Sequence, residues 1–412
     1  MFRFKIEATL QRVRGFSELM KSDPVWRARV AVCALTALQV ISWTCAWSQS
    51  APSRPATIAE QLSTEERLQK PTWWPTKGTF RRNDFVGDAA CAGCHAEIVK
   101  AQQSSAMART ATRAEDSQLL RAHPLNYKLG GYTYEAQTQD SKASYRVSDQ
   151  TSAFSAVLNW AFGIRMGQSY LFEKNGGVYM APLTYYPEAG TWDFTVDQPH
   201  SAPESLDKGV GRHLLDDEVR GCFNCHNTAA TTNGKFDPEH SIPGVTCEAC
   251  HGPAAYHVAA AGMGFSEGGT MILNPSHLSP VDSVDFCGAC HRTWWDITLA
   301  GGTGLKSIRF PPYRLENSRC WGKGDKRLTC TACHDPHQPL AREDSAYDDK
   351  CLACHVNSPS AKPTATHPGA ACPAATKDCV TCHMPKYKLT DIPVKFTDHQ
   401  IRVVRGNEPI PQ

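Results

Sequence analysis

Apolar positions are unevenly distributed along the 412 residues. The longest uncharged and mostly apolar run covers residues 30–48, and Arg27 and Arg29 directly precede it. This layout is typical of a signal peptide or of an N-terminal membrane anchor whose basic n-region, residues 1–29, stays in the cytoplasm. The run is close to the ~17–20 residues that span a bilayer. Both explanations stay open, and either one predicts export of the following residues.

A different pattern, with alternating aromatic and β-branched positions, appears further along the chain. It occurs in Tyr127–Gln137, Ala143–Ser148 and Gly177–Tyr186, and glycine-containing turns separate these runs. Alternation with a period of two between turn residues predicts strands. We therefore expect a small antiparallel β subdomain in a β-rich insert, residues 125–205. A packed loop is the alternative.

The rest of the chain has little continuous periodicity. Residues 49–85 are rich in Pro, Ser and Thr and predict a linker, with a short helix near Ile58–Gln69. Ala96–Thr112 contains few helix breakers and predicts a helix. Gly and Pro are frequent beyond the insert, so long helices are not expected there.

Eighteen cysteines add the strongest chemical signal. Fourteen of them occur in seven copies of Cys-x-x-Cys-His, the motif that attaches c-type haem. The two thiols bond to the porphyrin, and the adjacent histidine coordinates the iron. We predict seven covalent haems c, attached through Cys91, Cys94, Cys222, Cys225, Cys247, Cys250, Cys287, Cys290, Cys330, Cys333, Cys351, Cys354, Cys379 and Cys382. The proximal iron ligands are then His95, His226, His251, His291, His334, His355 and His383.

Zinc sites and disulfides are competing explanations of paired cysteines. Neither requires a histidine directly after the second cysteine, whereas all seven copies have one. One copy would be a weak signal, but seven copies favour haem.

The spacing of the motifs divides the chain into regions. The first motif is isolated in a first haem segment, residues 86–124, and the other six lie in a six-haem region, residues 206–412. Haems would supply the apolar core there, in place of periodic side chains. The expected fold is a multihaem cytochrome c: loop-rich, with short α-helices beginning at each motif, a small antiparallel β subdomain and one N-terminal hydrophobic helix.

Each iron also needs a sixth ligand or an open position. Nine histidines lie outside the motifs. His257 and His337 follow their own motifs too closely to reach the far face of the same haem easily, so we expect them to ligate neighbouring haems. The strongest candidates are His257, His337 and His399, followed by His213, His240 and His367, and then by His123, His200 and His277.

The first haem has no obvious histidine nearby. Met107 lies twelve residues after His95. A methionine ligand would raise the potential of that haem above those of bis-histidine haems. Packing of Met107 on a helix face is the alternative.

The second half of the chain resembles the multihaem c-type cytochromes of the cytochrome c-552/c-554 type. The resemblance covers most of residues 205–403, and residues 91–110 are similar to the first haem segment of that family, where a histidine or methionine often occupies the position of Met107. It implies electron transfer through close-packed haems in the periplasm, with His257, His337, His367 and His399 as ligands. The strings that carry it are Cys222-Phe223-Asn224-Cys225-His226, Pro243-Gly244-Val245-Thr246-Cys247-Glu248 with Cys250-His251-Gly252-Pro253, Cys333-His334-Asp335-Pro336-His337, Cys382-His383-Met384-Pro385-Lys386 and Phe396-Thr397-Asp398-His399.

An electron carrier is the leading functional hypothesis, because electron passage along haems needs no catalytic residue. The first alternative is an oxidoreductase that acts on a small nitrogen or sulfur compound at a five-coordinate haem. The second is a subunit of a membrane or extracellular electron-transfer assembly. The spin state of the haems separates a carrier from an enzyme.

The net charge and the N-terminal apolar segment indicate the partners and the compartment. The formal net charge is +2, of which residues 1–48 contribute +4 and the remainder −2. No basic patch or aromatic–basic platform predicts nucleic-acid binding. We expect a redox protein as donor, another as acceptor, and a possible quinone-linked membrane complex. The location would be periplasmic or otherwise exported, with a possible anchor in the inner membrane.

Two cysteines of the exported region remain outside the motifs, Cys320 and Cys372. An even remainder in an oxidising compartment predicts a disulfide between them. Two buried thiols are the alternative.

Overall fold

The computed structural model describes residues 80–265, 271–302, 304–322, 327–355, 372 and 374–404. The predicted n-region, the hydrophobic segment 30–48, the helix near Ile58–Gln69, most of the linker and His367 therefore lie outside the described residues. Within the described ranges, no helix has the length and apolar character needed to cross a membrane.

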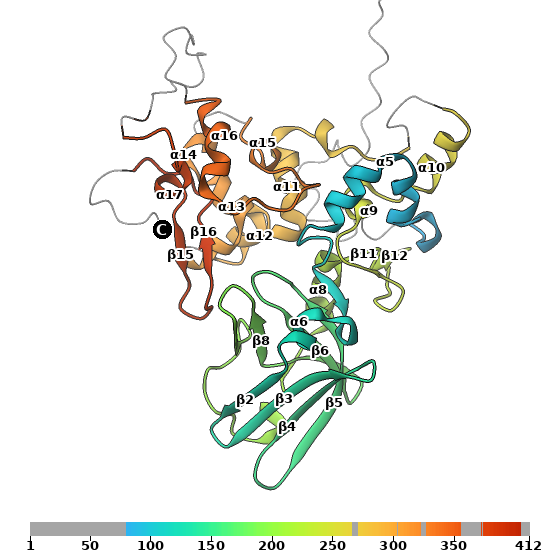
Figure 1. The fold of residues 1–412 in the computed structure, drawn as a ribbon, viewed down its shortest axis with the longest axis vertical. Coiled ribbons are helices and arrows are strands. Elements are labelled where there is room, and N and C mark those ends of the chain that lie inside the picture. Colours follow the sequence, from blue (N-terminus) through green and yellow to red (C-terminus); the bar gives the residue numbers. More distant parts are fainter. Residues whose placement is uncertain are drawn as a thin grey trace, which may run out of the picture. The chain divides into compact units, whose positions relative to one another are not determined.

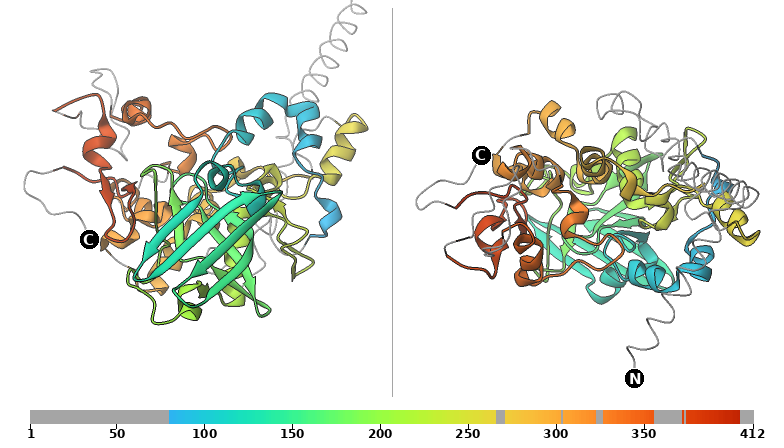
Figure 2. Two further views of the ribbon diagram at one scale, coloured as in Figure 1. Left: turned by 60° about the horizontal axis from the view of Figure 1, so that its bottom comes forward. Right: turned by 90° about the horizontal axis from the view of Figure 1, so that it is seen from above.

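The β-rich insert forms an antiparallel sheet in which strands adjacent in sequence mostly pair with each other. The strand order is β10-β7-β6-β5-β4-β3-β2, and β1 pairs with β5 at the end of that strand (Figures 1 and 2). The strands are β1 Ala111–Arg113, β2 Leu125–Leu129, β3 Tyr132–Gln139, β4 Lys142–Ser148, β5 Ala153–Phe162, β6 Ser169–Lys174, β7 Gly177–Met180 and β10 Arg212–His213. A separate hairpin pairs β8 Leu183–Tyr186 with β9 Thr191–Phe194. The prediction of antiparallel β structure here is confirmed.

The run predicted over Tyr127–Gln137 is divided by a turn into β2 and β3. Gly130 and Gly131 form this turn with φ of +54° and +92°, which glycine adopts without steric cost. A Cβ atom on Gly130 would also lie 2.2 Å from the Cβ of Ala202. Glycine is therefore required for both the turn and the close packing.

The sequence analysis did not predict strand β5, because its alternation of apolar and polar residues stops halfway along the strand. Its first half alternates between outward and inward positions, whereas Trp160, Ala161 and Phe162 are all buried. The reason is that apolar cores lie on both faces of the sheet at this end. One contains Leu120, Tyr145 and Phe172, and the other contains Trp160, Phe162, Leu171 and Phe223.

Each haem motif begins in a helix outside the sheet. These helices are α5 Asp88–Gln103, α8 Asp216–His226, α9 Cys247–His251, α11 Pro280–His291, α15 Cys330–Cys333, α16 Asp348–Leu352 and α17 Cys379–His383. Only α9, α15 and α17 begin at the first cysteine, so the expectation that every helix begins there is wrong. The other four start earlier because helix-starting residues precede the motif, as Ser279 and Pro280 do for α11.

The helix predicted over Ala96–Thr112 is also displaced. Helix α5 begins at Asp88, before the motif, and ends at Gln103. A kink at His95, with φ −117° and ψ 38°, interrupts it. Ser104 and Ser105 then close the last turn through bonds to the carbonyl groups of Ala101 and Gln102, and the chain turns toward β1.

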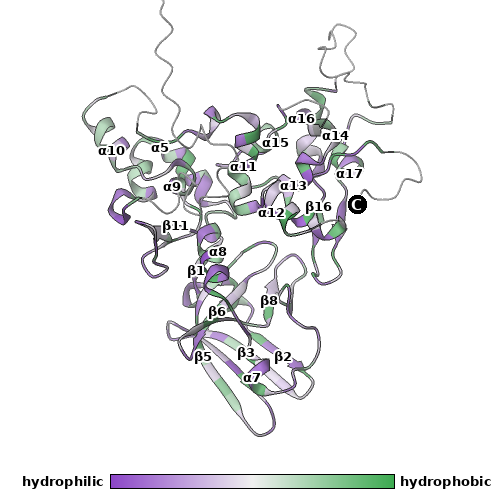
Figure 3. Cartoon of the chain, turned by 180° about the vertical axis from the view of Figure 1, so that it is seen from behind, coloured by the Kyte–Doolittle hydropathy of each residue, from purple (hydrophilic) through white to green (hydrophobic). Residues whose placement is uncertain are grey.

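Short elements fill the remaining described ranges. Hydrophobic and hydrophilic residues are interspersed along them (Figure 3). The α-helices are α6 Gln118–Ala122, α7 Leu206–Gly209, α10 Ala255–Gly262, α12 Trp294–Leu299, α13 Pro311–Glu316 and α14 Arg319–Gly322. The strand pairs are β11 Asn227–Thr228 with β14 Ile242–Pro243, β12 Thr231–Thr232 with β13 Lys235–Phe236, and β15 Lys386–Lys388 with β16 Lys395–Thr397. Short 3-10 helices cover Arg82–Asp84, Ala114–Asp116, Pro275–His277, Gly304–Arg309 and Asp344–Tyr347.

Candidate functional site

The motif helices contact one another in pairs through their first cysteines. The Cys91 side chain lies beside that of Cys247, which joins the first motif to the third. Two further contacts of the same kind join other motifs: Cys287 with Cys330, and Cys351 with Cys379. The fourth motif is thereby joined to the fifth, and the sixth to the seventh.

Carboxylates hold two of these pairs together in the same way. Asp88 lies three residues before Cys91 and accepts a hydrogen bond of 3.2 Å from the backbone N–H of Cys247. Asp348 lies three residues before Cys351 and accepts a hydrogen bond of 2.9 Å from the backbone N–H of Cys379. In each pair an acidic residue at the start of one helix caps the helix of the partner motif. Sequence analysis missed both residues, although the shared spacing to the cysteine is visible in the sequence.

Glu248 makes a further, buried connection between the first and third motifs. Its carboxylate accepts hydrogen bonds from the backbone N–H groups of Val86 at 2.9 Å, Gly87 at 2.8 Å and Ala254 at 2.9 Å. The side chain is fully buried. Three N–H donors compensate the cost of burying this charge, so Glu248 fixes the first haem segment against α9.

Burial disfavours the thiolate form of six attachment cysteines. Burial raises the pKa of Cys91, Cys222, Cys247, Cys333 and Cys351, and it raises the pKa of Cys379 to about 12. A desolvated thiolate is disfavoured, and these surroundings suit the uncharged sulfur of a thioether.

Three proximal histidines are held by a bond to one ring nitrogen. Nδ1 of His251 lies 2.9 Å from the Leu273 carbonyl oxygen, and Nδ1 of His383 lies 2.7 Å from that of Arg402. A carbonyl can only accept, so Nδ1 carries the proton and Nε2 keeps its lone pair for a metal. Nδ1 of His226 similarly lies 2.7 Å from the Thr110 hydroxyl. With paired thiols alongside, these residues fit haem c, whose iron supplies one-electron chemistry when bound.

Two candidate sixth ligands face proximal histidines of other motifs. The His337 ring lies 5.9 Å from the His251 ring, centroid to centroid, with 10° between the ring planes. The His399 ring lies 6.2 Å from the His334 ring, with 44° between the planes. A metal bonded at about 2.0–2.1 Å to each of two imidazole nitrogens separates the ring centroids by roughly 6 Å. Both pairs have the separation that an iron between them requires.

His399 is set in place by its surroundings. Its Nδ1 lies 3.1 Å from the Thr397 carbonyl oxygen, and burial lowers its pKa to about 4. The neighbouring Asp398 forms a buried, two-bond ion pair with Arg314 of α13, at 2.8 and 2.7 Å. Sequence analysis missed Arg314, because nothing in the sequence pairs it with Asp398.

The remaining candidate ligands have varied environments. Met107 is half-buried, and its carbonyl oxygen accepts from the N–H of Val245, two residues before the third motif. His257 is half-buried on α10. His240 is exposed and bonded to Asp237 at 2.9 Å, and His213 lies on β10 with its ring 5.1 Å from that of Tyr179.

The lower-ranked histidines contact aromatic rings or a turn. His123 stacks on Tyr185 at 4.4 Å and His200 on Phe194 at 4.3 Å, while His277 ends a 3-10 helix. Among the described residues, no group of three or more His, Cys, Asp and Glu side chains is arranged to hold a metal ion by itself.

The predicted disulfide between Cys320 and Cys372 is wrong. Both residues are thiols in the structure. Cys320 is half-buried on α14, whereas Cys372 is exposed. An even number of leftover cysteines carries no information about distance, and a disulfide needs Cα atoms within ~7 Å.

Comparison with known proteins gives matches to multihaem cytochromes. Residues 196–252 match the family described as cytochrome c554 and c-prime. The multiheme cytochrome MtrA of Shewanella baltica (strain OS185) is 24% identical over 225 residues, which are 50% of this chain and 64% of the relative, just under two thirds of its length. The solved structure of the outer cell wall cytochrome OcwA superposes with a TM-score of 0.47 and 15% identity, covering 78% of this chain and 80% of that one.

The matched family segment includes the second and third motifs, whose histidines have the bonding just described. Together with the seven motifs, the family match and the similarity to MtrA show that the chain is a multihaem c-type cytochrome.

Proposed function

We propose that this cytochrome carries seven haems c and transfers electrons along them between redox partners. The observation that carries the proposal is the pairwise contact of motifs through Cys91–Cys247, Cys287–Cys330 and Cys351–Cys379. Contact between attachment cysteines brings the edges of the attached haems together. Close-packed haems pass electrons without any catalytic side chain.

Further contacts join the pairs into one network. The Cys225 thiol donates to the Ala289 carbonyl oxygen at 3.7 Å, which links the second motif to the fourth. His337, which follows the fifth motif, faces His251 of the third. His399, which follows the seventh, faces His334 of the fifth. Every motif therefore has a neighbour in this network, as electron transfer through the whole chain requires.

Bis-histidine ligation is the second part of the proposal. His337 would complete the iron attached at Cys247 and Cys250, and His399 the iron attached at Cys330 and Cys333. Met107 is proposed for the first haem, and His257 for a haem adjacent to α10. His213, His240 and His367 remain weaker candidates, because the first two have other contacts and the third lies outside the described residues.

The proposed setting is outside the cytoplasm. Residues 30–48 would serve as a signal peptide or an inner-membrane anchor. The partners would then be a redox donor and a redox acceptor, and a quinone-linked membrane complex could fill the first role.

A haem count and a spin count test this function. The pyridine haemochrome assay, set against the protein mass, should give seven haems per chain. Electron paramagnetic resonance during a redox titration should show low-spin haems spread over a range of potentials. Fewer haems would overturn the heptahaem assignment. A high-spin haem that binds nitrite, hydroxylamine or sulfite would instead support the enzyme alternative.

A further inference from the structure

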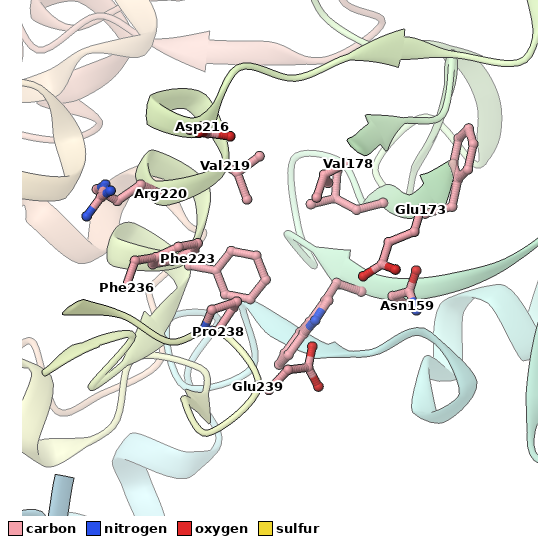
Figure 4. Close-up of a pocket in the computed structure, with 13 residues that line it drawn as sticks. Asn159, Glu173, Val178, Asp216, Val219, Arg220, Phe223, Phe236, Pro238 and Glu239 are labelled. Atoms are coloured by element: carbon pink, nitrogen blue, oxygen red, sulfur yellow. The ribbon is translucent and has the colours of Figure 1, made fainter. Parts of the chain in front are cut away.

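The apolar core between the sheet and α8 borders an open cavity of about 330 Å³. Strands β5, β6 and β7 line it on one side, and α8 with residues 236–239 on the other (Figure 4). Its walls are aromatic: Trp160 and Phe223 are buried and Phe236 is half-buried. A volume of ~300 Å³ is at the lower end of the range for small-molecule sites, so the cavity suits a small ligand, and its aromatic walls favour one with an aromatic ring.

The cavity lies next to the haem motif of α8. The helix contributes Asp216, Val219, Arg220 and Phe223 to the lining, at the i, i+3, i+4 and i+7 spacing of a single helix face. Cys222 is not part of the lining, but it packs against the same apolar core as Trp160 and Phe223. A ligand in the cavity would thus lie beside the part of α8 that carries Cys222.

A series of aromatic rings connects the cavity with the proximal histidine of this haem. Trp160 and Phe223 in the wall contact Phe162, with centroid distances of 6.1 Å and 5.1 Å. Phe162 in turn lies 5.3 Å from the ring of His226. Neighbouring rings therefore lead from the cavity wall to the proposed iron ligand.

The charges at the cavity rim favour a cation over an anion. Glu239 is neutralised by Arg113 at 2.8 Å, and Arg113 also lies over the Trp160 ring at 4.1 Å. In the part of the chain that the structure describes, neither Glu173 nor Asp216 takes part in an ion pair. Figure 4 shows the Glu173 carboxylate beside Asn159, while Arg220 lies on the opposite side of the cavity. The guanidinium of Arg220 is positioned over Phe236, at 5.4 Å.

We propose that this cavity binds a planar aromatic redox carrier, cationic or neutral, and that the carrier exchanges electrons with the haem attached at Cys222 and Cys225. The inference rests on the proposed function, since it supplies an entry point for electrons. In each transfer the reduced carrier loses one electron and the ferric iron of that haem becomes ferrous. A proton released by the carrier passes to water.

Binding is tested on the oxidised holoprotein by titration calorimetry with N-methylphenazinium, a planar cation. Val178→Phe fills the cavity and should weaken binding at least tenfold. Glu173→Gln should weaken it about threefold, whereas Glu135→Gln, a matched change on β3 away from the cavity, should leave it unchanged. Anthraquinone-2,6-disulfonate, a planar dianion, should bind at least tenfold more weakly. An absence of heat, or equal affinity in Val178→Phe, would overturn the inference.

The electron path is tested by stopped-flow reduction with the reduced form of the same probe. Phe162→Leu should preserve the dissociation constant and slow the first electron transfer at least threefold. Should that variant fail to fold, Val178→Phe must slow reduction by the carrier while reduction by dithionite keeps its wild-type rate. Normal dithionite reduction without carrier binding would overturn the cavity proposal and leave the proposed function intact. Haems that dithionite does not reduce would overturn the proposed function itself.

Discussion

The imidazole rings of His337 and His251 lie 5.9 Å apart and nearly parallel, although the first follows the fifth haem motif and the second closes the third. An iron bonded to one nitrogen of each ring would impose this separation. The contact brings together the third and fifth motifs, which are far apart in the sequence.

We predict that His337→Ala converts one low-spin haem to high spin, because the iron proposed to lie between His337 and His251 loses its sixth ligand. Electron paramagnetic resonance of the oxidised protein would detect the change. The matched control is His200→Ala, since His200 is exposed and stacks on the Phe194 ring of the β-rich insert. An unchanged spectrum in His337→Ala would remove this histidine from the ligand set.

Replacement of Met107 tests the first haem. Met107→His should lower the potential of a single haem and leave the others unchanged, because a thioether ligand raises the potential relative to imidazole. A spectroelectrochemical titration measures this shift. The ligand assignment fails if Met107→Ala leaves every potential and spectrum as in the unmodified protein.

The buried pair of Arg314 and Asp398 should be costly to break. Arg314→Leu leaves the Asp398 carboxylate buried without its partner, which typically costs about 3–5 kcal/mol. Chemical unfolding of the holoprotein measures the loss. We also expect a shifted potential for the haem proposed to bind His399, since the pair holds the preceding residue. Arg146→Ala, which removes an exposed pair with Glu135, should change stability by less than ~1 kcal/mol.

Loss of the haems should affect the two parts of the chain differently. The sheet has its own core, with Leu120, Tyr145 and Phe172 almost fully buried, whereas the motif helices are short and depend on the cofactor. Without the haem-attachment machinery, limited proteolysis should release a resistant fragment containing β2 to β7 and degrade the remainder. Protection of residues 280–400 in the apo-protein would contradict the prediction.

The Cys372 thiol should react at lower pH than an ordinary cysteine. Backbone N–H groups of Ala375 and Ala374 lower its pKa by stabilising the thiolate, and the thiolate is the reactive form. The rate of alkylation at this residue, followed by peptide mass spectrometry, should therefore rise with a midpoint below pH ~8.5. Cys372→Ser removes the signal. A midpoint at or above that value would refute the prediction.

The sequence predicted the chemistry of the motifs better than their arrangement. The attachment cysteines are predicted from local spacing alone, because thioether formation constrains five consecutive residues. The antiparallel strands followed from alternation, except where β5 is covered on both faces. The sequence could not predict that Cys91 lies beside Cys247 or that Arg314 pairs with Asp398. Contacts between distant residues produce no periodic pattern in a single sequence.

The carboxylates that cap partner helices have a consequence for biogenesis. Asp88 caps the helix of the third motif and Glu248 binds the backbone before the first, so the first haem segment cannot complete its packing until the third motif has been synthesised. The segment around the first motif stays incompletely enclosed while the β-rich insert and two further motifs are made. The segments of this cytochrome are therefore synthesised in one order and enclosed in another.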